Sequence, residues 1–356
     1  MEFLSEYGLF LAKAITVVIA ILVVVGAIAA QAARNRAPGH ISGHIEVRNI
    51  NHVFEQFEEH LQSSILDEAE IKLLHASRKK EAKAKEKELK KQRKNGSAPS
   101  PRKRMFVLNF EGDVKASDVE LLRHEISAIL TVASVNDEVM VNIESPGGMV
   151  HTYGLAASQL QRIRAAGIPL TACVDKVAAS GGYLMACVAN KIVAAPFAVV
   201  GSIGVLAQVP NFNRVLKRFD VDYEVMTAGE HKAPITLFGE ITEKGRSKLK
   251  EELEETHLLF KDFIAVHRPQ VSLVEVATGE VWYGQQAIEH KLVDTILTSD
   301  DYLLQNRKET DIYEVTYVEK QTLQDRLSAA FGRGMTAVTD RLLQRNQESA
   351  VTREIS

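Results

Sequence analysis

Strand and helix patterns alternate over residues 105–174, and this alternation is the feature that most constrains the fold. Short apolar runs predict strands, and the segments between them carry the apolar repeat of amphipathic helices. The expected strands are 105–112, 139–144 and 168–174, and the expected helices are 119–132 and 150–166. Strict alternation implies crossover units, so we predict an α/β fold: a largely parallel sheet with flanking helices.

The pattern continues toward the C-terminus. Apolar runs predict strands at 191–196 and 222–229, a long helix is expected over 242–267, and residues 279–296 are typical of a strand, turn, helix and strand. Beyond about Glu319 the sequence indicates a polar helical tail. We therefore divide the chain into an N-terminal segment 1–36, a helical stretch and linker 37–104, a globular domain 105–318 and a tail 319–356.

The N-terminal segment contains an uncharged apolar run, residues 14–30. With the apolar residues 9–12 before Lys13, this run reaches the length of about 20 residues that spans a bilayer. It predicts a single transmembrane helix that anchors the chain. A cleavable signal peptide is the alternative, because Ala30 and Ala32 fit a cleavage site, although the apolar run is long for one.

The helical stretch that follows is basic. The chain has a net charge of −3, but residues 78–104 contain 13 Lys or Arg and only 3 Glu. The Lys/Glu/Ala-rich pattern over 51–94 favours a solvated helical stalk, and residues 95–101 (NGSAPSP) form a linker. A phospholipid-binding patch is the alternative. No nucleic-acid partner is expected, because no aromatic residues interleave the lysines.

The cysteines and the known motifs exclude several classes of site. Cys173 and Cys187 lie in apolar surroundings, have no neighbour at metal-ligand spacing, and are expected to be buried core thiols. No Walker sequence and no paired His/Cys ligand set is present. We therefore expect no metal and no cofactor.

Two expected strands end in glycine-containing turns that lead into helices. The first turn is SPGG, residues 145–148, and the second is ASGG, residues 179–182. In a doubly wound sheet such turns converge beyond the carboxyl ends of the strands. Glycines let backbone N–H groups face a ligand, so Gly148 and Gly181 are candidate donors of an oxyanion hole. Ser180, just before Gly181, is either a helix N-cap or a nucleophile.

A serine nucleophile needs a base, and no histidine of this chain is accompanied by an aspartate placed to orient it. Lys232 lies in a turn closed by Pro234. A lysine can act as a base when its ammonium is removed from water, because desolvation favours the neutral amine. Spacing alone gives Lys232 little weight among 43 Lys and Arg residues, and a solvated surface lysine remains the alternative.

Four ordered motifs resemble one known family. They are ESPGGMVHTYGLAAS, VDKVAASGGYLMAC, GSIGV and WYGQQAIEHKLVD. Together they strongly resemble the signal peptide peptidase A family of membrane-bound Ser/Lys proteases, and the resemblance covers essentially the full length. The chain is most similar to the members that have one N-terminal span and one catalytic domain. The resemblance implies a crotonase/ClpP-like fold for residues 105–318, as the catalytic domain.

The resemblance also implies roles for individual residues. Ser180 corresponds to the nucleophile, Lys232 to the general base, and Ser202 of GSIGV to the serine that hydrogen-bonds the lysine amine. Gly148 and Gly181 correspond to the oxyanion-hole donors. The family often has Tyr before the lysine and Ser after it, whereas this chain has His231 and Ala233, so His231 is an alternative base.

The expected function is that of a membrane-anchored serine endopeptidase. The resemblance implies hydrophobic peptide substrates, such as signal-peptide remnants or membrane-protein fragments, and a homo-oligomeric ring. It places the chain in the bacterial inner membrane and leaves the side of the catalytic domain open. Two alternatives are a crotonase-like enzyme that binds acyl-CoA and a non-catalytic membrane scaffold in which Ser180 is only a helix cap.

Overall fold

The computed structural model describes residues 13, 16, 43–94, 102–229 and 231–320. Nearly all of the predicted transmembrane run and of the predicted tail lies outside these residues. None of the helices within the described ranges has the length and apolar character needed to cross a membrane. Residues 45–318 form one compact unit. The fold described below is that of this unit.

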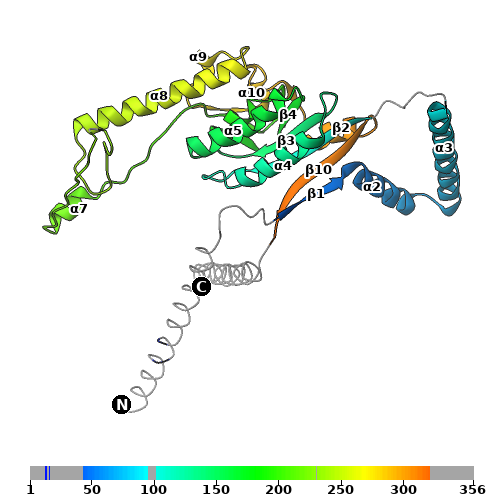
Figure 1. Ribbon diagram of the computed structural model, residues 1–356, viewed down its shortest axis with the longest axis horizontal. Coiled ribbons are helices and arrows are strands. Elements are labelled where there is room, and N and C mark those ends of the chain that lie inside the picture. The colour runs from blue at the N-terminus through cyan, green and yellow to red at the C-terminus, as the bar shows by residue number, and fades with distance from the viewer. Residues whose placement is uncertain (1–12, 14–15, 17–42, 95–101, 230, 321–356) are drawn as a thin grey trace, which may run out of the picture. The chain divides into compact units, whose positions relative to one another are not determined.

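The core of the fold is a mostly parallel β-sheet (Figure 1). Its strand order is β1-β10-β2-β3-β4-β6-β9, and every pair from β10 to β9 is parallel. The strands are β1 (Gly43–Asn49), β10 (Thr310–Glu319), β2 (Lys103–Glu111), β3 (Glu138–Glu144), β4 (Leu170–Val174), β6 (Lys191–Ala194) and β9 (Thr295–Ile296). The predicted α/β class, with a largely parallel sheet, is confirmed.

A smaller sheet carries the segments that matter for function. It contains β5 (Val177–Ala179), β7 (Val199–Gly201) and β8 (Val281–Tyr283), in the order β5-β7-β8. β5 and β7 are parallel, whereas β7 and β8 are antiparallel. An isolated bridge between Ser145 and Ala178 connects this small sheet to the end of β3.

Helices follow the strands in the expected alternation and flank the sheet. Those of the described residues are α2 (Ile50–Ile65), α3 (Glu68–Lys94), α4 (Val119–Val132), α5 (Val150–Ala165), α6 (Gly181–Ala186), α7 (Asn213–Arg218), α8 (Glu243–His267), α9 (Leu273–Val276), α10 (Gly284–Ala287) and α11 (Ser299–Asn306). The helices predicted at 119–132, 150–166 and 242–267 match α4, α5 and α8 within about one residue.

The two faces of the sheet pack against different helices, because successive side chains of a strand point to opposite faces. Leu108 and Phe110 of β2 belong to the large core that α4 and α5 cover (Figure 1). Met105 and Val107 belong to a second, smaller core that includes Ile50 of α2 and residues of α11. The sheet is therefore buried on both faces over its central strands.

The structure differs from the sequence analysis in four segments. The strand expected at 222–229 is absent, and its apolar residues, among them Val225 and Met226, are exposed without a partner strand. β1, from the segment assigned to the stalk, and β10, just before the tail, are sheet strands that the sequence analysis did not anticipate. The helix expected over 51–94 is interrupted after Ile65, so α2 and α3 are separate helices.

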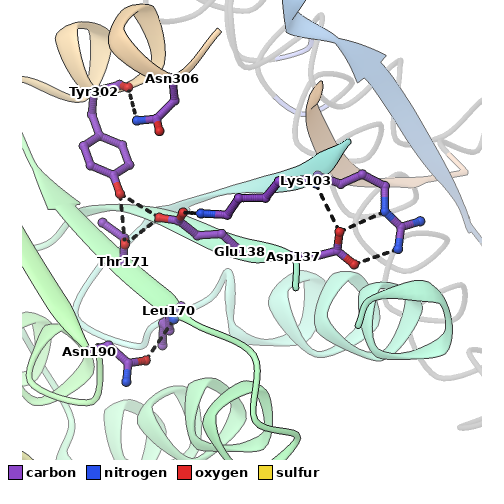
Figure 2. Close-up of polar contacts among 9 residues, drawn as sticks. Lys103, Asp137, Glu138, Leu170, Thr171, Asn190, Tyr302 and Asn306 are labelled. Atoms are coloured by element: carbon purple, nitrogen blue, oxygen red, sulfur yellow. Dashed lines mark hydrogen bonds and ion pairs between the residues drawn. The ribbon is translucent and has the colours of Figure 1, made fainter. Parts of the chain in front are cut away.

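A buried polar cluster lies at the edge of the sheet where β2 and β3 begin (Figure 2). The Glu138 carboxylate accepts hydrogen bonds from Lys103 Nζ at 2.5 Å, Tyr302 Oη at 2.7 Å and Thr171 Oγ1 at 2.8 Å. Burial alone would raise the pKa of Glu138, but these hydrogen bonds outweigh burial and lower the pKa. The cluster joins α11 to the sheet at the end opposite to the glycine turns.

Candidate active site

Ser180 occupies a strained position between β5 and α6. Its backbone angles are φ 50° and ψ −116°, in a region that non-glycine residues rarely adopt. The backbone is held there because the Ser180 N–H donates to the Gly201 carbonyl at 2.8 Å and the Ser180 carbonyl accepts the Leu184 N–H at 2.9 Å. Such strain costs about 1–3 kcal/mol and is concentrated at functional sites.

Ser180 stands at the N-cap position of α6, but its side chain makes no capping hydrogen bond. An N-cap serine normally has extended backbone angles and accepts an N–H of the first helical turn with its hydroxyl oxygen. Neither condition holds here. The N-cap explanation of this serine is therefore wrong, and its half-buried hydroxyl is not used to hold the helix end.

Ser202 leaves the neighbouring strand at the same edge of the small sheet. β5 and β7 run parallel with Ala179 opposite Gly201, so the residues that follow, Ser180 and Ser202, emerge side by side. Ser202 also has a positive φ, 52°, and its N–H donates to the Glu280 carbonyl of the segment before β8 at 2.7 Å. The backbone therefore fixes both serines at the ends of paired strands.

The SPGG turn packs directly against the serine. Gly147 has φ 91°, and a Cβ atom on it would lie 2.7 Å from both Ser180 Cβ and Gly181 N. A Cβ atom on Gly148 would lie 2.2 Å from the carbonyl oxygen of Val114. Only glycine permits these two backbone approaches. The turn is thus held between the serine on one side and the loop after β2 on the other.

Two N–H groups of this arrangement are available as donors. Gly181 is the first residue of α6, where an N–H has no acceptor within its helix. Among the residues that the structure describes, no acceptor bonds the N–H of Gly181 or of Gly148. The structure therefore brings Ser180, Ser202 and these two glycines together.

Lys232 lies on a different part of the chain. It is exposed on the segment between α7 and α8, where the Pro234 carbonyl packs against Gly245 in the first turn of α8. The same helix contacts the segment after Ser202 through His257, whose Nε2 lies 3.2 Å from the Ile203 carbonyl oxygen. Twelve helical residues between Gly245 and His257 correspond to about 18 Å. The segment that carries Lys232 therefore packs on α8 about three turns away from that helix's contact near Ser202.

The segment that carries Lys232 has little core of its own. His231 is exposed on it as well, and the segment displays many exposed apolar side chains, including Leu206, Phe212, Phe219, Val221, Met226 and Leu237. Its aromatic rings pack on one another, and the ring centroids of Phe212 and Phe238 are 6.0 Å apart. Monomeric soluble proteins rarely leave so many apolar side chains exposed in one segment.

Sequence reasoning identified the turns but missed the residues beneath them. Tyr153 of α5 is fully buried, and its Oη lies 2.5 Å from Ser145 Oγ. From the sequence alone, a tyrosine at this position of an amphipathic helix indicates only a residue of the hydrophobic core. The two cysteines are buried, as predicted, and burial raises the pKa of both thiols.

Known protein families and individual relatives match the chain over most of its length. The family models described as Peptidase family S49 N-terminal and Peptidase family S49 match residues 2–160 and 162–313. "Probable protease SohB" of Haemophilus influenzae is 48% identical over 90% of this chain and 91% of its own. "Probable protease SohB" of Buchnera aphidicola subsp. Schlechtendalia chinensis is 44% identical over 85% of this chain and 99% of its own. "Protease 4" of Salmonella typhi is 28% identical over 54% of this chain and 30% of its own.

Proposed function

The chain belongs to peptidase family S49, and from this premise we propose that it is a serine endopeptidase with Ser180 as nucleophile and Lys232 as general base. The observation that carries the proposal is the geometry of Ser180. Its strained backbone leaves the hydroxyl without a capping hydrogen bond, directly before Gly181 and against the SPGG turn that contains Gly148. A nucleophile next to two unpaired donors is the arrangement that acyl transfer requires.

The proposed reaction proceeds through an acyl-enzyme. The neutral Lys232 amine takes the proton of Ser180 Oγ while the oxygen attacks the peptide carbonyl carbon. The N–H groups of Gly148 and Gly181 donate to the oxyanion that develops on the carbonyl oxygen. The protonated amine gives its proton to the leaving amine, and a water molecule, activated by the same lysine, then hydrolyses the ester. Ser202 would accept a hydrogen bond from the lysine and orient it.

The position of Lys232 indicates how the dyad forms. The lysine is two residues before Pro234, which packs on α8 about 18 Å from the contact near Ser202, and its segment has exposed apolar side chains. We infer that self-association buries this segment and brings the lysine of one copy to the serine of a neighbour. Burial also removes the ammonium from water and so favours the neutral amine that a base requires. A homo-oligomeric ring satisfies both needs with one repeated head-to-tail interface.

Substrate and location follow from the N-terminal apolar run, residues 14–30. As a single transmembrane helix in a bacterial inner membrane, it would keep the active site next to the bilayer. Hydrophobic peptides released there, such as signal-peptide remnants and fragments of membrane proteins, are the proposed substrates.

The test is cleavage of an apolar fluorogenic peptide by the full-length protein in detergent. Ser180→Ala and Lys232→Ala should each abolish cleavage with the fold intact by circular dichroism, whereas His231→Gln should retain it. Mixing the two inactive variants should restore about a quarter of the wild-type rate, because random assembly gives that share of sites an intact serine and an intact neighbouring lysine.

Three results would contradict parts of the proposal. Full activity in Ser180→Ala would remove the protease mechanism. Full activity in Lys232→Ala would remove the lysine as base and direct attention to His231. A mixture that stays inactive, although copies of the two variants carrying different tags co-purify, would place serine and lysine within the same chain.

A further inference from the structure

A continuous chain of buried hydrogen bonds runs beneath the SPGG turn. The Gly147 N–H donates to Ser145 Oγ at 3.0 Å, and Ser145 Oγ lies 2.5 Å from Tyr153 Oη. Tyr153 Oη in turn lies 2.7 Å from the carbonyl oxygen of Asp113. Both side chains are fully buried, so no solvent competes for these bonds.

The proton positions in this chain follow from the partners. The Asp113 carbonyl can only accept, so the single proton of Tyr153 Oη must point to it. Ser145 must then donate its proton to Tyr153 Oη, and its oxygen accepts the Gly147 N–H. Burial raises the pKa of Tyr153, which keeps the phenol protonated and able to donate. Each donor in this series of hydrogen bonds has one acceptor, and the direction of donation, from Gly147 toward the Asp113 carbonyl, cannot be reversed.

Tyr153 also touches each of the three segments that form the site. Its hydroxyl holds the loop after β2 through Asp113 and the SPGG turn through Ser145. Its ring supports the residue after the serine, since a Cβ atom on Gly181 would lie 2.4 Å from Tyr153 Cγ. The loop after β2 holds Gly148 in place, because the Val114 carbonyl accepts the Met149 N–H at 2.8 Å.

We propose that Tyr153, acting through Ser145, is a positioning residue that fixes the Gly147–Gly148 backbone so that the Gly148 N–H faces the oxyanion. This inference rests on the proposed function of Gly148 and Gly181. It assigns Tyr153 no contact with substrate. The role predicts that removal of one oxygen atom, with the ring retained, lowers the rate of acyl transfer without weakening substrate binding.

The experiment compares two substitutions that each remove one buried phenol oxygen. Tyr153→Phe removes the link between the loop and the turn. Tyr302→Phe removes a comparable buried bond, to Glu138, at the opposite edge of the sheet (Figure 2). Peptide cleavage is measured for both variants in the full-length protein. Ser145→Ala interrupts the same series of hydrogen bonds at a second position, and Ser180→Ala gives the background rate.

Tyr153→Phe and Ser145→Ala should lower kcat about 10- to 100-fold with KM within about twofold, because a donor misplaced by about 1 Å costs rate rather than binding. Tyr302→Phe should keep kcat within about twofold of wild type. Equal kcat in Tyr153→Phe and wild type, or an equal loss in Tyr302→Phe, would overturn the proposal, because the role would then be absent or merely structural.

Hydrogen exchange separates this proposal from the proposed function. In Tyr153→Phe, peptides that cover residues 145–149 should exchange faster than in wild type, and in Tyr302→Phe they should not. This readout needs no activity. If Ser180→Ala still cleaves peptide, the proposed function fails while the exchange result still decides whether Tyr153 fixes the turn. Unchanged exchange over 145–149 would overturn the positioning role even if the protease mechanism holds.

Discussion

Glu125 is a buried carboxyl group whose protonation should control the stability of this fold. It lies on α4 with only 4% of its surface exposed, and its Oε1 accepts the N–H of Tyr317 in β10 at 2.8 Å. Burial raises the pKa of Glu125 from its ordinary value of 4.5 to about 7, and the charge of Asp118 adds to the rise. The hydrogen bond from Tyr317 opposes the shift but does not cancel it.

The sign of the effect follows from comparing the folded and unfolded states. Well below pH 4.5 the carboxyl is protonated in both states, and the stabilisation is complete. As the pH rises toward 7, the unfolded chain loses this proton while the folded chain keeps it. Ionisation therefore lowers the free energy of the unfolded state, and the fold becomes less stable. A shift from 4.5 to about 7 corresponds to a loss of about 3 kcal/mol by pH 8.

Glu125→Gln keeps the shape and the acceptor for Tyr317 but cannot ionise. Its free energy of unfolding should equal that of wild type near pH 4 and exceed it by about 3 kcal/mol at pH 8, a rise in Tm of about 6–12 °C. Thermal unfolding of both proteins from pH 4 to pH 8 measures this difference. Glu120→Gln removes an exposed carboxylate from the same helix and serves as the control.

The reasoning fails if the advantage of Glu125→Gln is the same at pH 5 and pH 8, since no proton would then distinguish the folded and unfolded states at this residue. It also fails if Glu120→Gln shows an equal dependence on pH, because the effect would then come from overall charge.

Two further predictions follow from the packing. Gly148→Ala would place a Cβ atom 2.2 Å from the Val114 carbonyl oxygen, so the turn must shift. Peptide cleavage should fall at least about 100-fold while the circular dichroism spectrum stays unchanged. Retained activity would argue against Gly148 as a donor. Arg268, 2% exposed, donates to both carboxylate oxygens of Asp294 at 2.7 and 2.8 Å. Arg268→Ala removes these hydrogen bonds but leaves a carboxylate that water reaches, so the free energy of unfolding should fall by about 2–3 kcal/mol. A loss below about 1 kcal/mol in urea unfolding would show that water replaces the arginine.

Elements with strong local patterns were predicted accurately from the sequence. α4, α5 and α8 and the strands β2, β3, β4 and β6 match their predicted ranges within a few residues. Their apolar repeats are long enough to distinguish helix from strand. The strand expected at 222–229 failed for the converse reason: its residues have strand propensity, but no neighbouring strand pairs with them.

β1 and β10 were missed because their strand character depends on partners far away in the sequence. Thr310 of β10 pairs with Lys103 of β2, and Asn51, just after β1, donates to the carbonyls of Arg307 and Thr310. The alternation of polar and apolar residues in β10 is a local strand signal, but it does not say which strand β10 joins. Only the pairing with β2 decides its place in the sheet.

By itself, the sequence determined the parallel α/β sheet, the two glycine turns and the serine within the second turn, because periodicity and the need for a backbone without Cβ atoms are local properties. Only the tertiary structure decided that Ser180 does not cap its helix, that Tyr153 connects three segments beneath the turn, and that the Pro234 contact near Lys232 lies about 18 Å along α8 from the contact near Ser202. These facts depend on contacts between residues far apart in the chain. Such contacts form only when the whole core packs, and no short stretch of sequence records them.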